Sequence, residues 1–170
     1  MRAFAKDQIT AGLTPLGREQ ARFTARRLRS VSVGAIYCST LGRAMETAEL
    51  IAKEFPGVSL RPSKLLWELP NLGPVDDKTW RSVFAQGKRR GERAFAKFVR
   101  PARQKQRAEI VVSHGNLIRY FVCRILGIEP KAWSTLGTSH CGITQVNITQ
   151  DQVRMVCYNE TRHLPDRLRT

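Results

Sequence analysis

The sequence predicts an α/β fold whose sheet is largely parallel. Between residues 14 and 126, short apolar runs typical of strands alternate with segments whose apolar residues recur at helical spacing. The end of the chain alternates like two antiparallel strands joined by a short turn. Because strand–helix–strand–helix order builds a parallel sheet with helices on its faces, we expect an α/β domain that ends in a hairpin.

Length and composition fit a single folded domain. The chain has 170 residues, 42% of them hydrophobic, which is enough to bury a sizeable core. These values exclude a wholly disordered chain and a disulfide-stapled miniprotein. No apolar run approaches the about 20 residues needed to span a bilayer. No linker or internal repeat divides the sequence, so we expect residues 1–170 to form one domain.

The first part of the chain holds two expected helices with a strand between them. A helix is predicted to begin at Thr14-Pro15, a hydroxyl N-cap followed by proline at the first helical position. Residues 34–39 (GAIYCS) form a short apolar run of strand type. Ser39 is expected to cap the next helix, which ends before the Pro56-Gly57 turn.

The rest of the chain continues this alternation. We expect a strand at 58–60, a loop opening at 65–70, a basic helix at 80–99, a strand at 109–113, a helix at 116–126, and hairpin strands at 142–148 and 152–158. The run EIVVS at 109–113 carries the strongest strand pattern of the set.

Net charge is the one extreme value of the composition. The formal charge is +15, and between Lys88 and Arg107 nine cations accompany a single acid, Glu92. Such a stretch attracts an anionic partner, whether nucleic acid, acidic lipid, phosphoprotein or polyphosphorylated substrate, although a solvated helix face explains it equally well. A nucleic-acid-binding domain ranks last, because Phe95 and Phe98 fit the core face of an amphipathic helix and no recognised binding motif is present.

The four cysteines predict reduced, structural thiols. None forms a C-x-x-C pair, and no histidine stands at metal-ligand spacing from any of them; they are Cys38, Cys123, Cys141 and Cys157. Free thiols in apolar stretches behave as small hydrophobic residues. We therefore expect a cytosol-like compartment and a cytoplasmic protein, with organellar targeting upstream of Met1 left open.

Two strand-to-helix junctions carry residues suited to phosphate. Arg43 lies four residues past the end of the 34–39 strand, and His114 stands where the 109–113 strand stops. In parallel sheets, ligands bind at the carboxyl ends of strands, and helix N-termini attract anions. A guanidinium and an imidazole that converge there favour a phosphate site. Position alone leaves open that His114 is a structural hydrogen-bond partner.

Glu68 is the third candidate for a functional role. Its neighbours in the sequence are apolar: Leu65, Leu66, Trp67 and Leu69. A carboxyl in such surroundings loses solvation, which raises its pKa and lets it act as a general acid. The alternative is an exposed loop acid among apolar residues that pack inward.

Four segments occur in an order and at a spacing that resemble a known family. They are LTPLGREQA (13–21), CSTLGRAMETAELIA (38–52), the LWE segment and VVSHGNLIR (111–119). Together they resemble the phosphoglycerate mutase-like branch of the histidine phosphatase superfamily, and the first segment is nearly the same as in mitochondrial Ser/Thr protein phosphatases of that branch. The resemblance covers about residues 13–160 and implies a three-layer α/β/α sandwich.

The resemblance also implies roles for individual residues. Arg43 would bind the phosphoryl group, Glu68 would occupy the proton-donor region, and His114 would be the second active-site histidine, in contact with phosphate. Ser39 and Asn116 match residues that line the pocket. The implied chemistry is hydrolysis of a phosphorylated small molecule or phosphoprotein through a phosphohistidine, with no metal or other cofactor. Assembly into a homo-oligomer is left open.

One part of the family pattern is missing. The nucleophile of the family belongs to an R-H-G or R-H-S motif that ends the first strand, whereas this chain has only His114, His140 and His163. The Arg162-His163 pair follows the final strand and is expected to be structural, and His140 is expected to form hydrogen bonds. Either the chain is a fragment whose nucleophile lies upstream, or it is a degenerate member that binds phosphate without hydrolysing it.

Three functional hypotheses follow from these patterns. The first is a phosphatase acting on phosphomonoesters or phosphoproteins, and the second is a non-catalytic phosphate-binding or scaffold protein on the same fold. The third is the basic nucleic-acid-binding domain. A mutase is disfavoured, because the loop after Glu68 is short and the protein-phosphatase segments match better. Purified residues 1–170 are expected to turn over little of a generic aryl phosphate.

Overall fold

The structure alternates strands and helices and ends in a hairpin, as the sequence predicts. This computed structural model describes residues 9–70, 78–101 and 108–170. Residues 102–107, the end of the basic stretch, lie outside the described residues. The elements are α2 (Pro15–Leu28), β1 (Val33–Cys38), α3 (Gly42–Ala52), β2 (Leu60–Pro62), η1 (Lys64–Leu66), α4 (Lys78–Phe98), β3 (Ala108–Val112), α5 (Gly115–Leu126), η2 (Pro130–Thr135), β4 (Ile143–Ile148), β5 (Val153–Glu160) and η3 (Asp166–Leu168).

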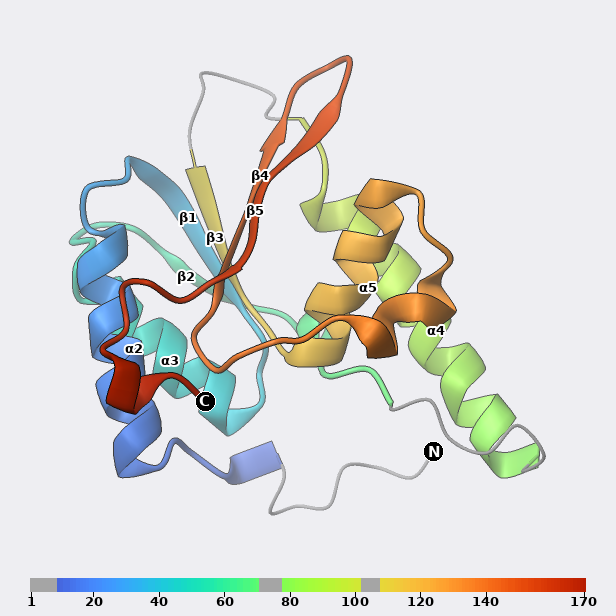
Figure 1. Cartoon of the computed structure of the whole chain (residues 1–170), viewed down its shortest axis with the longest axis horizontal. Helices are drawn as coiled ribbons and strands as arrows, with labels where there is room; N and C mark the ends of the chain where they lie inside the picture. Colours follow the sequence, from blue (N-terminus) through green and yellow to red (C-terminus); the bar gives the residue numbers. More distant parts are fainter. Residues whose placement is uncertain (1–8, 71–77, 102–107) are drawn as a thin grey trace.

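A three-stranded parallel sheet lies at the centre of the molecule (Figure 1). The strand order is β2-β1-β3, with Cys38 of β1 opposite Pro62 of β2 and Val112 of β3. Strands β4 and β5 pair antiparallel in a sheet of their own. Among the described strands, none pairs with the outer edge of β3.

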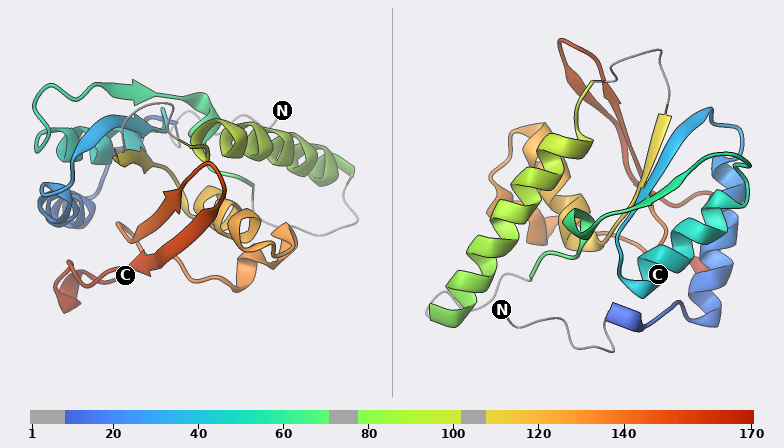
Figure 2. Two further views of the ribbon diagram at one scale, coloured as in Figure 1. Left: turned by 90° about the horizontal axis from the view of Figure 1, so that it is seen from above. Right: turned by 180° about the vertical axis from the view of Figure 1, so that it is seen from behind.

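Helices cover both faces of this sheet, as Figures 1 and 2 show, so the expected three-layer arrangement is confirmed. Side chains of a strand alternate between its faces. Ile36 and Cys38 of β1 therefore pack in a cluster with α2 and α3. Tyr37, between them, packs with α4 and α5 in a second cluster around Leu117 and Tyr120.

The beginning of α2 confirms the predicted cap. The Thr14 side chain accepts a hydrogen bond from the Gly17 amide at 3.1 Å, and Pro15 opens the helix. The prediction that Ser39 caps the next helix is wrong. Leu41 is the N-cap of α3, and Ser39 Oγ instead accepts from the Leu41 amide at 3.2 Å, which closes a turn before the helix begins.

Strand β2 lies two residues later than predicted, because Leu60–Pro62 pairs with β1. Proline within an apolar run normally argues against a strand, but an edge strand tolerates it where its missing N–H faces away from the partner. β2 is such an edge strand.

All four cysteines are free, as expected from their spacing. Within the described parts of the chain, no group of three or more His, Cys, Asp and Glu side chains is placed to hold a metal ion. No helix over the same residues is long and apolar enough to cross a membrane.

Candidate functional site

The carboxyl ends of β1 and β3 lie next to each other, and this places both predicted junctions at one edge of the sheet. The Ser39 amide donates to the Val112 carbonyl at 2.9 Å, so the chain leaves both strands side by side. Helix α3 begins at Gly42, which puts Arg43 in its first turn. Helix α5 begins at Gly115, with His114 as its N-cap residue.

His114 is buried at this edge, with 6% of its surface exposed. Its Nε2 is buried and has no hydrogen-bond partner among the described residues. Burial, and then the charges of Arg43 and Arg90, lower the pKa of His114 from 6.5 to about 3. The imidazole is therefore neutral near pH 7, and Nε2 is available to a ligand.

Glu68 reaches the same place from the loop after η1. Its Oε1 accepts from the Asn116 amide at 3.0 Å and from the Leu69 amide at 3.1 Å. Burial raises the pKa of Glu68, while these amides and the charge of Arg43 oppose the rise. The sequence suggested that the N-terminal amides of the last helix form an anion site. At α5, the carboxyl of Glu68 already occupies part of that position.

Arg43 acts electrostatically on both neighbours. Its charge adds to the burial that lowers the pKa of His114, and it opposes the burial that raises the pKa of Glu68. Three groups of different chemistry thus lie near one another, close enough for the Arg43 charge to act on the pKa of the other two: a guanidinium, a neutral imidazole and a partly desolvated carboxyl. This combination suits a phosphoryl group, which needs a fixed cation, a hydrogen-bond donor and a proton source.

Ser39 and Asn116 lie at the site but are held by protein groups. Ser39 is fully buried and accepts from the Leu41 amide. The Asn116 side chain donates from Nδ2 to the Leu69 carbonyl at 3.0 Å and accepts at Oδ1 from Arg119 at 3.1 Å. The bond from Asn116 to Leu69 ties the α5 N-terminus to the Glu68 loop.

Several residues that hold the site together were not singled out from the sequence. Arg90 of α4 donates to the carbonyl oxygens of Trp67 and Glu68. The Trp67 indole donates to Thr40 Oγ1 at 2.6 Å, and Ser113 Oγ donates to the Leu66 carbonyl at 2.9 Å. The signal that could have indicated Arg90 is its position between Gly87 and Gly91, because small residues allow a helix to approach closely.

The other two histidines form bonds outside this group. His163 Nε2 lies 2.9 Å from Thr24 Oγ1 on α2, and its Nδ1 lies 3.5 Å from a carboxyl oxygen of Glu160. His140 Nδ1 lies 2.9 Å from Thr170 Oγ1. The expected structural role of His163 and hydrogen-bonding role of His140 agree with these contacts.

Comparison with known proteins identifies the family of this chain. The sequence model of the histidine phosphatase superfamily (branch 1) matches residues 4–89 and 79–161. The chain belongs to this superfamily. The resemblance noted in the sequence, and the phosphoglycerate mutase-like fold it implied, are therefore confirmed.

Curated relatives give a more specific similarity. The chain is 39% identical over 148 residues to the mitochondrial serine/threonine-protein phosphatase Pgam5 of Caenorhabditis briggsae, covering 81% of this chain and 52% of that protein. It is 43% identical over 129 residues to the Xenopus tropicalis protein of the same name, covering 71% and 46%. The chain thus spans about half the length of these relatives.

Solved structures share the fold over nearly the whole chain. A phosphoglycerate mutase from Plasmodium falciparum superposes with a TM-score of 0.67 at 30% identity, covering 90% of this chain and 89% of that one. A phosphoserine phosphatase from Entamoeba histolytica, in complex with 3-phosphoglyceric acid, superposes with a TM-score of 0.72 at 22% identity, covering 91% and 87%.

The expected cytoplasmic location is contradicted by these relatives. The curated phosphatases from worm, frog and mouse are all named mitochondrial. Free cysteines indicate that a compartment is reducing, and this condition does not distinguish one reducing compartment from another. The argument from the thiols was therefore too weak to assign an organelle.

Proposed function

We propose that this domain binds the dianion of a phosphate monoester between Arg43 and His114 and positions it for hydrolysis. The guanidinium binds two phosphoryl oxygens, and His114 Nε2 donates to one of them when it carries the imidazole proton. Glu68 gives a proton to the leaving oxygen. The observation that carries the proposal is the buried, unpartnered Nε2 of His114 beside the charges of Arg43 and Arg90.

The names of the relatives support a proposal for the substrate class. Because the curated relatives are named serine/threonine-protein phosphatases, we assign phosphoserine and phosphothreonine proteins as substrates, ahead of small phosphate monoesters. We also assign a mitochondrial location, because the same relatives are named mitochondrial.

We infer that these 170 residues do not supply the nucleophile of the reaction. Of the three histidines in the sequence, His140 and His163 bond to residues of other segments, which leaves His114 alone at the site. Strand β3 leads to His114, and none of the described strands pairs with its outer edge. A further strand could therefore pair there. A histidine at the carboxyl end of a strand paired there would face the same phosphate. We therefore expect residues 1–170 alone to bind phosphate with little turnover.

Replacing Arg43 tests the proposed site. Arg43→Gln is expected to weaken the binding of inorganic phosphate by about 30-fold, since a charge-assisted hydrogen bond contributes about 2 kcal/mol. Isothermal titration calorimetry measures the change, and p-nitrophenyl phosphate measures turnover on the same samples.

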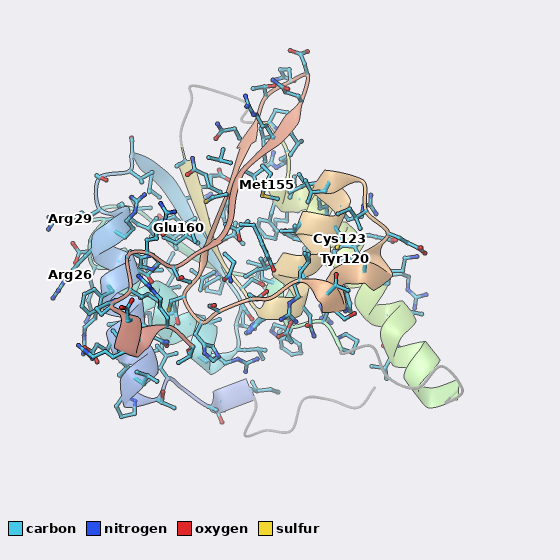
Figure 3. The ribbon with its side chains drawn as sticks, viewed as in Figure 1. Arg26, Arg29, Tyr120, Cys123, Met155 and Glu160 are labelled. Carbon is cyan, nitrogen blue, oxygen red and sulfur yellow. The ribbon has the colours of Figure 1, made fainter. Side chains whose placement is uncertain are left out.

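The matched control is Arg29→Gln, because Arg29 points away from the body of the molecule at the end of α2 (Figure 3). Equal affinity in Arg43→Gln and Arg29→Gln would contradict the proposed site. Turnover by the wild-type chain at rates typical of the family would contradict the statement about the nucleophile.

The basic face of α4 supports a second role, the binding of an anionic partner. Described cations on this helix and just after it are exposed: Lys88, Arg89, Arg93, Lys97 and Arg100. Phe95 lies in the core cluster with Tyr120, which agrees with its expected place on the apolar face. We assign an acidic protein or lipid surface as the partner, with nucleic acid as the alternative.

The salt dependence of binding tests this second role. Replacing Arg89, Arg93 and Lys97 with Gln is expected to flatten the plot of log affinity for a polyanion such as heparin against log salt concentration. Each ion pair with the polyanion that the substitutions remove lowers the slope by up to about 0.9, if the partner behaves like duplex nucleic acid. The variant Arg22→Gln/Arg26→Gln/Arg29→Gln removes the same charge from α2, where these arginines are exposed. If both triple variants flatten the plot equally, only net charge matters and the α4 face is not a binding surface.

A further inference from the structure

Arg90 stands apart from the other described cations of α4 because its side chain faces the protein. Its Nη2 donates to the Trp67 carbonyl at 3.2 Å and also to the Glu68 carbonyl. Burial lowers the pKa of its guanidinium, and the charge of Glu68 opposes that effect. In the sequence Arg90 is one of nine cations in a basic stretch, but in the fold it reaches the candidate site.

Two glycines allow α4 to lie against the Glu68 loop. A Cβ atom on Gly87 would stand 2.7 Å from Pro70 Cδ, and one on Gly91 would stand 3.1 Å from Tyr120 Cε1. A larger residue at Gly87 would therefore push the helix away from the residues that follow Glu68. At the distance that the glycines permit, the Arg90 side chain spans the remaining gap to the loop carbonyls.

The two carbonyls that Arg90 holds are consecutive, so the peptide groups on both sides of Glu68 are fixed. The carboxyl of Glu68 is oriented by amides of Leu69 and Asn116, and the first of these belongs to one of the fixed peptides. A shift of the loop would therefore move the carboxyl away from α5.

Stability alone does not explain a partly buried guanidinium at this position. Its Nε is buried with no hydrogen-bond partner in the described part of the chain. Taking a cation out of water costs stability, and apolar residues often replace buried charges without loss. Leu69, Ala94 and Tyr120 already form an apolar cluster beside it, which an apolar side chain would extend.

We propose that Arg90 is the positioning residue of Glu68: it holds the loop so that the carboxyl stays at the N-terminus of α5, beside His114. This inference rests on the proposed function, in which Glu68 is the proton donor. Burial and the charge of Arg43 lower the pKa of His114, and the Arg90 charge adds to this effect.

NMR of the 170-residue chain tests this proposal without requiring turnover. The amide proton of Asn116 reports on Glu68, because it donates to Glu68 Oε1 at 3.0 Å. In the wild type its chemical shift is expected to follow the titration of Glu68, and Glu68→Gln removes that response. Arg90→Gln is expected to abolish the response as well. Arg90→Lys, which can still donate to a carbonyl, is expected to keep part of it.

The control is Arg93→Gln, an exposed cation three residues further along α4, which should leave the Asn116 response unchanged. The His114 titration midpoint gives a second readout: it should rise in Arg90→Gln and stay near the wild-type value in Arg90→Lys. If Arg90→Gln does not fold, a wild-type Asn116 response in Arg90→Lys, rather than a reduced one, overturns the proposal. An unchanged response in folded Arg90→Gln overturns it directly.

Titration of the same samples with inorganic phosphate separates the two proposals. If the wild type binds no phosphate but Arg90→Gln loses the Asn116 response, the proposed function fails and the positioning role stands. If phosphate binds and the Asn116 response survives in Arg90→Gln, the positioning role fails alone.

Discussion

Between pH 7 and pH 4, the wild-type protein is expected to lose about 3 kcal/mol more unfolding free energy than the variant His114→Gln. The pKa of His114 falls from 6.5 to about 3 in the folded protein, chiefly through burial. Below pH 6.5 the His114 imidazole binds a proton in the unfolded chain but stays neutral in the folded chain until the pH approaches 3. Stability contributed by the neutral imidazole is therefore complete above about pH 6.5 and is lost progressively as the pH falls toward 3.

Urea unfolding at the two pH values measures this difference. The other acid-sensitive groups are common to both proteins; they include Glu19 and Glu46, whose pKa values are lowered by hydrogen bonds. Their contributions cancel in the comparison. If both proteins lose the same free energy within about 0.5 kcal/mol, His114 is solvated in solution and the site is more open than the structure indicates.

Tyr120→Ala is expected to lower the unfolding free energy by about 4 kcal/mol, because large aromatic-to-alanine changes in a core remove buried apolar area and leave a cavity. Tyr120 is 1% exposed, and its ring lies 6.2 Å from that of Trp133 and 6.4 Å from that of Phe121. Figure 3 marks Tyr120 and Cys123 on α5. The same ring faces Gly91 of α4, so the cavity would form where the two helices meet.

The matched control is Tyr120→Phe, which keeps the ring and removes only a long hydrogen bond from Arg124 at 3.4 Å. It is expected to cost less than about 1 kcal/mol. Urea denaturation at pH 7 compares both variants with the wild type. A loss of stability in Tyr120→Ala no larger than in Tyr120→Phe would mean that α4 and α5 do not share this core in solution.

Local sequence patterns predicted most of the elements, with errors at particular boundaries. The Thr14-Pro15 start of α2 and the hairpin follow from rules that involve neighbouring residues only. The β2 boundary was missed, because only the edge position of this strand makes Pro62 acceptable. Ser39 was misassigned because a hydroxyl that closes a turn and one that caps a helix look alike in sequence.

In the candidate site, too, some features could be predicted from local sequence patterns and others could not. Arg43 and His114 could be found from the sequence, because each lies at a fixed offset from the end of a strand and parallel strands end at the same edge. Glu68 could be named from its apolar neighbours, but its bond to the Asn116 amide joins segments 48 residues apart. No local pattern encodes such a distance.

The superfamily could be recognised from the sequence through the resemblance of its motif segments. The α/β layering and the edge of the sheet that carries Arg43 and His114 could be predicted from the sequence as well, since periodicity and strand ends are local properties of a chain. Only the packed fold decided that the Asn116 amide goes to Glu68 and that Arg90 turns inward to hold the loop. The reason is that these bonds depend on how closely α4 and α5 dock against a distant loop, and docking is set by the shapes of many side chains at once.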